Sequence, residues 1–456
     1  MGIKFDAIVI GSGQGGNPLT YKMADSGLRV ALIEEKHLGG TCINTGCTPT
    51  KTIVASAQVA HYVKNAKRWG VRAPNFAADL PAIVKRKNDV VLRFRSGQEK
   101  QAAKRDNVAL YRGHARFTGP RTIEVNGESL ESERIFIDTG SRPLIPEIEG
   151  LASIPYLTNE SILDLEQLPE HLMVLGGGYI GLEFGQMFRR FGSRVTIVHQ
   201  GREILPREDD DVASELRKAL ESEGIGFLLE AKTRRVSGDS RQITLDFSGS
   251  HEPLTGTHLL VAAGRRPNTD TLDLDKAGVQ SDERGYIKVN GRLETSAPGI
   301  WAIGDVKGGP AFTHISYNDF QVIYANVFEG KNLSVDNRIV PYCVFTDPQL
   351  GGVGMTEKEA RAKGHKLKVG KIPCTSVARA IERDETAGLM KIVVNAANDR
   401  VLGASILSAD GGELVQILHT LMLADRPYTL LKGAIYIHPT MAEGFFGLLE
   451  SVKDVN

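Results

Sequence analysis

The feature that most constrains this chain is a glycine-rich pattern that occurs twice. Each copy joins an apolar stretch, typical of a buried strand, to a stretch compatible with a helix, through a loop of the form G-x-G-x-x-G. The strand-like stretches are 5–10 and 171–175, and the helix-like stretches are 17–26 and 182–191. A strand followed by such a loop and a helix predicts a βαβ unit of a parallel sheet.

Both loops have the composition expected of a dinucleotide site. Glycines allow a tight turn and let a pyrophosphate approach the amides at the helix N-terminus. A plain chain reversal is the alternative reading for either loop. The expected contact residues are Gly11, Gly13 and Gly16 in the first loop and Gly176, Gly178, Tyr179, Ile180 and Gly181 in the second.

A second, weaker similarity follows each copy: two matching apolar stretches end in glycine turns at Gly140 and Gly264. The first copy is the longer one, and its extra residues include 39–51 and a charged helical stretch near 77–105. Beyond about residue 336, alternating strands and a helix indicate an α+β layout. We therefore expect an α/β protein with two Rossmann-like dinucleotide-binding domains and a C-terminal α+β domain. The expected segments are 1–148, 149–268, 269–336 and 337–456.

Charge and composition exclude several classes of protein. The 456 residues carry 55 basic and 55 acidic side chains, so the net charge is 0 and no global charge attracts nucleic acid or an anionic membrane. No apolar run is long enough to span a bilayer, and the N-terminus lacks a signal-peptide pattern. We expect a cytoplasmic protein with neither a nucleic-acid nor a membrane partner. Four cysteines in a reducing compartment point to a catalytic or metal-binding pair rather than to a disulfide framework.

The residue that ends the second strand of each unit bears on the choice of dinucleotide. In the first unit it is Glu34, whose carboxylate can accept both hydroxyls of an adenosine ribose, as in FAD or NAD. At the same offset the second unit has His199, with Arg202 beside it. The pocket then lacks the charge that would repel a 2′-phosphate and gains one that could bind it. We expect NADPH at the second loop, with NADH as the alternative.

Two cysteines, Cys42 and Cys47, lie five positions apart in a Gly/Thr/Pro-rich turn before a helix-compatible run. A thiol at a helix N-terminus with Lys51 one turn further on has the electropositive setting that thiol–disulfide exchange requires. Two small buried residues are the alternative interpretation. Zinc is poorly supported, since neither a second cysteine pair nor a histidine pair lies at ligand spacing. We expect no resident metal.

With these motifs in order, the sequence resembles the class I pyridine nucleotide–disulfide oxidoreductases, the family of dihydrolipoamide dehydrogenase, glutathione reductase and mercuric reductase. The resemblance covers essentially the whole chain: both glycine loops, the C-x-x-x-x-C motif, Gly304-Asp305 and the segment His438-Pro-Thr-Met-Ala-Glu443. The segments around the first loop and the cysteines are most similar to the mercuric reductase-like branch. The resemblance implies an FAD domain, an NAD(P) domain, a return segment that completes the FAD domain, and a dimerisation domain.

The resemblance also implies catalytic roles. Cys42 would attack the substrate, and Cys47 would be the thiolate that contacts the flavin. Lys51 would lie near the flavin and pair with Glu183. His438, oriented by Glu443, would be the general acid–base, supplied by the second subunit of a homodimer. Cys343 and Cys374 are expected to be structural.

Further residues are implied for the cofactors. Tyr179 would cover the nicotinamide pocket, and the Asp305 carboxylate would hold ribityl hydroxyls of the flavin. The remaining expected cofactor contacts are Gly40, Thr41, Lys51, His114, Ala115, Thr139, Gly140, Ala311, Phe312, Thr313, His314 and Gly264.

The expected reaction is electron transfer from NAD(P)H through FAD and the Cys42–Cys47 pair to a small disulfide or, as the less favoured acceptor, to a soft metal ion such as Hg(II). No cysteine follows Cys374, which argues against mercuric ion, and His199 argues against a housekeeping lipoamide role. One alternative is a flavoprotein that reduces metal ions, quinones or oxygen without a disulfide substrate and without His438. Another is a redox sensor that docks through the basic stretch 85–105, for which a solvated helix is the simpler interpretation.

Overall fold

A computed structural model describes residues 2–74 and 76–455. The chain divides into two compact units, each assembled from segments far apart in the sequence. The first contains Met1–Ile53, Ala82–Leu144 and Gly264–Arg338, and the second contains Val54–Pro81, Ile145–Ala263 and Ile339–Asn456. The four expected domain segments stay a prediction.

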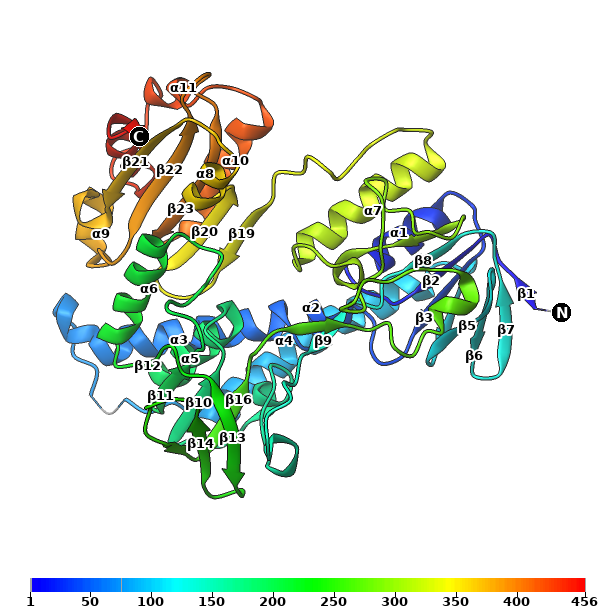
Figure 1. The fold of residues 1–456 in the computed structure, drawn as a ribbon, viewed down its shortest axis with the longest axis horizontal. Coiled ribbons are helices and arrows are strands. Elements are labelled where there is room, and N and C mark those ends of the chain that lie inside the picture. Colours follow the sequence, from blue (N-terminus) through cyan, green and yellow to red (C-terminus); the bar gives the residue numbers. More distant parts are fainter. Residues whose placement is uncertain (1, 75, 456) are drawn as a thin grey trace. The chain divides into compact units, whose positions relative to one another are not determined.

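The first unit is built on a five-stranded parallel sheet (Figure 1). Its strand order is β18 (Ile300–Ala302), β8 (Ile135–Ile137), β2 (Ala7–Ile10), β3 (Val30–Glu34) and β4 (Val108–Arg112). All four strand pairs are parallel. The central strands are buried almost throughout, as expected for a parallel sheet covered on both faces. The segment expected to complete this domain supplies β18.

The first unit also contains helices and 3₁₀ turns. They are α1 (Gly16–Asp25), α2 (Gly40–Asn44), the start of α3 (Cys47–Asn65), α4 (Leu80–Ala103), α7 (Thr313–Phe328), η4 (Leu274–Ala277) and η5 (Gly304–Lys307). A second sheet contains β1 (Ile3–Lys4), β7 (Glu128–Glu131), β6 (Thr122–Val125) and β5 (Ala115–Gly119), and a two-stranded pair joins β9 (Ser141–Pro143) to β17 (Arg265–Pro267).

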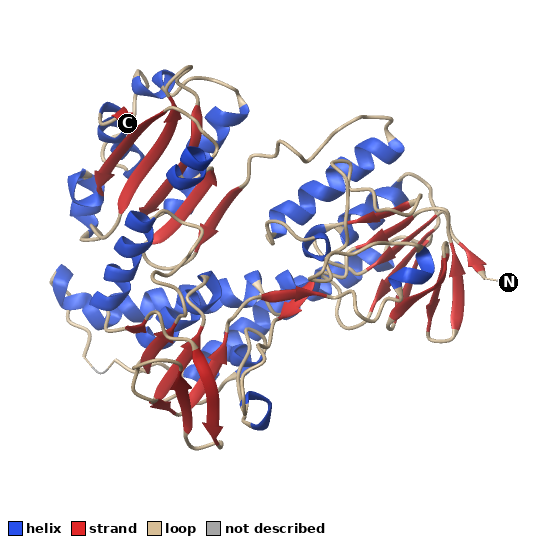
Figure 2. Cartoon of the chain, in the orientation of Figure 1, coloured by secondary structure: helices blue, strands red, loops and turns tan. Residues whose placement is uncertain are grey.

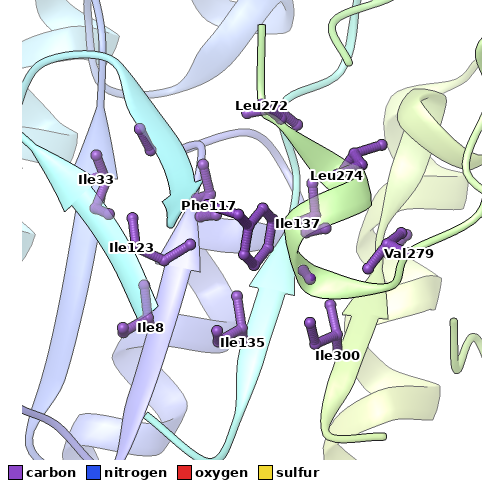
Figure 3. Packing of buried hydrophobic residues seen from close by; sticks show 14 of the residues in the cluster. Ile8, Ile33, Phe117, Ile123, Ile135, Ile137, Leu272, Leu274, Val279 and Ile300 are labelled. Carbon is purple, nitrogen blue, oxygen red and sulfur yellow. The ribbon is translucent and has the colours of Figure 1, made fainter. Parts of the chain in front are cut away.

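The two larger sheets of the first unit share a hydrophobic core (Figure 3). Phe117 on β5 is fully buried, and the cluster around it includes Ile8, Ile135 and Leu272. Truncating such a side chain to alanine costs about 3–5 kcal/mol. This core holds the parallel sheet, whose carboxyl edge carries the site described below, in a fixed position.

The second unit repeats the parallel arrangement. The order β12 (Gly226–Leu228), β11 (Arg194–Val198), β10 (His171–Leu175), β16 (His258–Val261) corresponds to β4, β3, β2, β8 of the first unit. Helices α5 (Tyr179–Phe191) and α6 (Asp210–Ser222) follow β10 and β11. An antiparallel sheet contains β13 (Thr233–Gly238), β14 (Ile243–Phe247) and β15 (Leu254–Gly256). The repeat seen in the sequence is therefore a repeat of Rossmann-like sheets.

The C-terminal part is a six-stranded antiparallel sheet with helices, an α+β layout (Figure 2). Its strand order is β19 (Pro341–Val344), β20 (Gln349–Gly354), β23 (Val401–Ser408), β22 (Leu389–Asn395), β21 (Leu367–Pro373) and β24 (Lys453–Val455). Its helices are α8 (Glu357–Ala362), α9 (Ala378–Arg383), α10 (Gly411–Leu423), α11 (Thr429–Lys432), α12 (Gly444–Glu450), η6 (Cys374–Ser376) and η7 (Met441–Glu443). The remaining 3₁₀ turns are η1 (Ala66–Trp69), η2 (Leu151–Ser153) and η3 (Ser161–Asp164).

A buried lysine joins this sheet to the second Rossmann-like sheet. The Nζ atom of Lys391 on β22 lies 3.1 Å from Asp209, 3.0 Å from Asp211 and 2.9 Å from Glu357. Asp209 precedes α6, and its carboxylate also accepts hydrogen bonds from the first backbone amides of α8. The lysine charge therefore balances carboxylates that come from both parts.

Most element bounds agree with the sequence-based expectation within a few residues. The helix after the second glycine loop begins earlier than expected, at Tyr179 rather than at residue 182, and α4 is shorter at both ends than the expected 77–105. Among the described residues, no helix combines the length and apolar character needed to cross a membrane.

Candidate redox and dinucleotide-binding site

The first glycine loop runs from the end of β2 to the start of α1, and its geometry requires glycine. Gly11 has φ +99°, and a Cβ atom there would lie 2.2 Å from the backbone oxygen of Asp138. A Cβ atom on Gly16 would lie 2.2 Å from the backbone oxygen of Gly11. The loop therefore packs closely against the sheet at the start of α1, as the tight turn of a dinucleotide-binding loop requires.

Glu34 lies beside this loop at the end of β3. Its Oε2 accepts hydrogen bonds from the Ser12 amide (3.0 Å) and hydroxyl (2.6 Å), and its Oε1 accepts one from the Lys36 amide (2.8 Å). These bonds fix the carboxylate next to the loop, and it retains lone pairs that can accept ribose hydroxyls. The position suits an adenosine ribose without a 2′-phosphate, as in FAD.

Other expected cofactor residues lie near the same edge of the sheet. Asp305 follows β18, and its Oδ2 accepts a hydrogen bond of 2.6 Å from the Ser141 hydroxyl. The Thr139 hydroxyl donates to the backbone oxygen of Asn268 (2.8 Å), and the His114 ring lies 3.0 Å from the backbone oxygen of Thr271. Carboxyl ends of parallel strands are where open α/β sheets bind ligands, so this donor and acceptor set fits FAD.

The cysteine motif lies at the junction of two helices. Cys42 is inside the short helix α2, and Cys47 is the first residue of α3. The Asn44 side-chain Nδ2 donates to the backbone oxygens of Leu38 and Gly40, which closes the turn that carries α2. The Cys47 Sγ lies 3.3 Å from the Thr313 hydroxyl at the start of α7. The motif thus contacts the 311–314 segment, in which the Phe312 and His314 rings stack at 5.3 Å.

The two thiols act on each other. A hydrogen bond with the Cys47 side chain, burial, and the repulsion between the two sulfurs raise the pKa of the Cys42 thiol, while Thr313 and Lys51 act in the opposite direction. Cys42 therefore keeps its proton at neutral pH, and the pair titrates as a unit. Nucleophilic attack by Cys42 consequently requires a base. The electropositive setting expected from the sequence belongs to the helix start, where Cys47 lies.

The second glycine loop repeats the geometry of the first. Gly176 has φ +127°, and a Cβ atom there would lie 2.3 Å from the backbone oxygen of Ala262. A Cβ atom on Gly181 would lie 2.2 Å from the backbone oxygen of Gly176, as in the first loop. A Cβ atom on Gly178, just before Tyr179 begins α5, would meet nothing within 4 Å. The helix start is therefore open to a ligand.

His199 lies against this loop rather than in a free surface position. Its Nδ1 accepts a hydrogen bond of 3.3 Å from the Gly177 amide, which leaves the ring proton on Nε2. Burial lowers the pKa of His199, so the imidazole is neutral at neutral pH. Arg202, three residues on, is exposed.

Glu183 is buried on α5 and accepts a hydrogen bond of 2.9 Å from the Phe345 amide. Its expected pairing with Lys51, which belongs to the other unit, stays a prediction. Arg190 on the same helix is not among the residues expected from the sequence, and its buried guanidinium binds Glu223 at 2.7 Å and Asp347 at 2.9 Å. The spacing of residues 183 and 190, two helical turns, was the available signal.

His438 and Glu443 form the pair expected from their spacing. The His438 Nδ1 lies 2.8 Å from the Glu443 Oε2, while 73% of the His438 side chain is exposed. The carboxylate is largely buried, and it orients the ring so that Nε2 faces outward. Ile435 and Ile437, which precede His438, are 98% and 78% exposed, and such apolar exposure is typical of a surface that a partner covers.

Comparison with known proteins agrees with this geometry. The profile of the pyridine nucleotide-disulphide oxidoreductases matches residues 5–319, and the profile of the dimerisation domain of the same family matches residues 340–447. The chain belongs to the pyridine nucleotide-disulphide oxidoreductase family. The probable pyridine nucleotide-disulfide oxidoreductase RclA of Escherichia coli is 38% identical over 99% of this chain and 100% of its own length. A dihydrolipoyl dehydrogenase of Thermus scotoductus is 38% identical over 98% of this chain and 97% of its own.

Two further relatives extend the comparison. A mercuric reductase of Lysinibacillus sphaericus is 34% identical over 96% of this chain and 81% of its own length. The solved structure described as the Cu(II) complex of the HOCl-induced flavoprotein disulfide reductase RclA from Escherichia coli has a TM-score of 0.90 and 38% identity, and the match covers 98% of this chain and 100% of that one.

Membership of this oxidoreductase family establishes the general activity. The enzyme is an FAD-dependent NAD(P)H oxidoreductase of the type that acts through a redox-active disulfide. The matched dimerisation domain supports a homodimer. The expected fold class, two Rossmann-like domains with an α+β dimerisation domain, is confirmed.

Proposed function

We propose that this enzyme passes electrons from NADPH, through FAD at the first glycine loop and the Cys42–Cys47 pair, to a small disulfide. The observation that carries the proposal is the contact of Cys42 with Cys47, together with the contact of Cys47 with Thr313 at the edge of the expected flavin site. A bound flavin supplies two-electron transfer between the nicotinamide and the cysteine pair. We further propose that the enzyme is located in the cytoplasm, because its electron donor is the reduced nicotinamide nucleotide of that compartment.

The reduced cysteine pair would act in two exchange steps. In the first, His438 of the second subunit takes the proton that Cys42 retains, and the Cys42 sulfur attacks the substrate disulfide. A mixed disulfide forms, and the released thiolate takes the proton back from His438. In the second, the Cys47 thiolate attacks the Cys42 sulfur, which restores the Cys42–Cys47 disulfide, and the leaving thiolate takes a proton from solvent to become the second thiol. The two electrons end on the two product thiols.

The preference for NADPH rests on His199 and Arg202. A carboxylate at the end of β11 would repel a 2′-phosphate, whereas His199 is uncharged and turned onto the loop. The imidazole therefore removes a repulsion without itself attracting the phosphate. The exposed Arg202 guanidinium supplies the attraction.

A second acceptor, a thiophilic metal ion, is supported by one observation. The related flavoprotein disulfide reductase from Escherichia coli has a solved structure described as a Cu(II) complex. Neighbouring thiols such as Cys42 and Cys47 are ligands that soft metal ions prefer. Within residues 2–74 and 76–455, no cluster of three or more His, Cys, Asp or Glu side chains could hold a metal ion. The metal would therefore be substrate at the cysteine pair.

The test uses the FAD-loaded dimer with NADPH and no oxygen. Cys42→Ser should abolish reduction of every small disulfide in a panel, while oxidation of NADPH by an artificial quinone continues. Cys343→Ser, which alters a cysteine distant in sequence from the motif, is the matched control and should retain both activities. Disulfide reduction at the wild-type rate by Cys42→Ser would refute the proposal. Reduction of Cu(II) or Hg(II) that depends on Cys42, without turnover of any disulfide, would favour the metal acceptor.

A further inference from the structure

A buried carboxyl group lies directly beneath the first glycine loop. Asp138 follows the apolar strand β8, and only 7% of the residue is exposed. Its Oδ2 accepts a hydrogen bond of 2.7 Å from the Gly16 amide at the start of α1. A Cβ atom on Gly13 would lie 2.6 Å from this oxygen, and one on Gly16 would lie 2.9 Å from it. The carboxyl group fills space that the glycines leave free.

Asp138 lies among other carboxylates. Burial is the main cause that raises the pKa of Asp138 well above its usual value, the Gly16 amide opposes this shift, and repulsion from Asp305, Asp319 and Glu34 adds to it. These three groups come from η5, α7 and β3.

Each of the three neighbouring carboxylates is stabilised by cations or hydrogen-bond donors of its own. Asp319 pairs with Arg338 at 2.7 Å and with Lys307 at 3.3 Å. Asp305 accepts from the Ser141 hydroxyl and lies 3.9 Å from Arg265, and Glu34 accepts from three donors. Asp138 has no cationic partner among the described residues and only the Gly16 amide as hydrogen-bond donor. The unionised acid is the form that this surrounding favours.

We propose that Asp138 is a positioning residue for the bound dinucleotide and that it works as the uncharged acid. The inference rests on the assignment of FAD to the first loop. The uncharged carboxyl group accepts the Gly16 hydrogen bond and fixes the helix start without adding charge beneath the pyrophosphate. The ionised form would place a negative charge under a ligand that already carries two. Protonation of Asp138 and binding of FAD therefore favour each other.

The sign of the pH dependence follows from this coupling. A pyrophosphate above the loop disfavours the carboxylate, so the pKa of Asp138 is higher with FAD bound than without it. Between those two pKa values, binding takes up a proton, and the affinity falls by up to about tenfold for each pH unit gained. If Asp138 only capped α1 as a carboxylate, it would stay ionised in both the free and the FAD-bound protein, and the FAD affinity would not depend on its protonation.

The experiment measures the FAD dissociation constant of stripped protein by flavin fluorescence at a series of pH values from mildly acidic to alkaline, because the pKa of Asp138 is raised well above its usual value. Asp138→Asn mimics the uncharged acid and keeps an oxygen for the Gly16 amide. Asp336→Asn, which changes an exposed carboxylate of the same unit, is the control. Wild type and Asp336→Asn should lose affinity as the pH rises. Asp138→Asn should lose this slope and bind FAD at least about tenfold more tightly than wild type at the alkaline end.

Equal slopes in wild type and Asp138→Asn would overturn the proposal. If the variant does not fold, calorimetry of wild type in two buffers of different ionisation enthalpy decides: proton uptake on FAD binding supports the proposal, and its absence overturns it. If FAD binds to neither protein at any pH, the assignment of the first loop is itself wrong, which is distinct from binding without a pH dependence.

Discussion

Replacing Glu443 by glutamine tests whether the exposed histidine is the acid–base group of the disulfide half of the reaction. Glu443 contacts His438 at 2.8 Å through a largely buried carboxylate. This charge-assisted hydrogen bond holds the ring and stabilises the imidazolium that forms when His438 takes the Cys42 proton. Such bonds contribute about 1.5–3 kcal/mol. We expect the variant to lose about 10- to 150-fold in kcat/KM for disulfide reduction, since each factor of ten corresponds to about 1.4 kcal/mol.

The assay compares two reactions of the same FAD-loaded dimer. NADPH-dependent reduction of a small disulfide needs His438, whereas NADPH-dependent reduction of an artificial quinone does not. Glu443→Gln should slow only the first reaction. Glu450→Gln, which alters an exposed carboxylate on the neighbouring α12, should leave both rates unchanged. Equal loss in both reactions, or no loss in disulfide reduction, would refute the assigned role.

Three further predictions concern stability and coenzyme choice. Lys391→Met leaves three carboxylates without their buried cation, so denaturant titrations should show an unfolding free energy lower by about 3–5 kcal/mol. The control is Lys371→Met: the Lys371 side chain is half-exposed, so its loss should lower the unfolding free energy by about 1 kcal/mol or less. Burial alone would raise the pKa of Glu223, but hydrogen bonds, chiefly from Arg190, lower it to about 2. The stabilising contribution of Glu223 is complete above its pKa in the unfolded chain, about 4.3, and is lost as the pH falls toward about 2. Glu223→Gln should therefore flatten the acid side of the curve of unfolding free energy against pH. An unchanged curve on that side would contradict this. Arg202→Leu should lower kcat/KM for NADPH by about tenfold or more and leave that for NADH unchanged in steady-state assays, and equal losses would contradict the 2′-phosphate contact.

The glycine loops could be predicted from the sequence because their signal is local. A strand, a G-x-G-x-x-G loop and a helix follow one another in the chain, and the same close approach to the backbone recurs at Gly11 and Gly176. The His438–Glu443 pair could be predicted for the same reason, since the two residues are five positions apart in the sequence.

The clusters that bring distant segments together could not be predicted in this way. Arg190 meets Asp347 across more than a hundred residues of sequence, and Lys391 gathers carboxylates from α6 and α8. The role of Asp138 could not be predicted, because only the packed loop shows that its carboxyl group is buried against the start of α1. The orientation of the His199 ring could not be predicted either, because the hydrogen bond from the Gly177 amide forms only in the folded loop.

The central claim is that Cys42 and Cys47 form the redox couple of this enzyme. The most direct measurement is anaerobic reduction of the FAD-loaded dimer by NADPH, followed by alkylation and mass spectrometry of each cysteine. We predict that NADPH makes Cys42 and Cys47 newly alkylable together, while the labelling of Cys343 and Cys374 does not change. Oxidation of NADPH with no gain of label at either Cys42 or Cys47 would contradict the account.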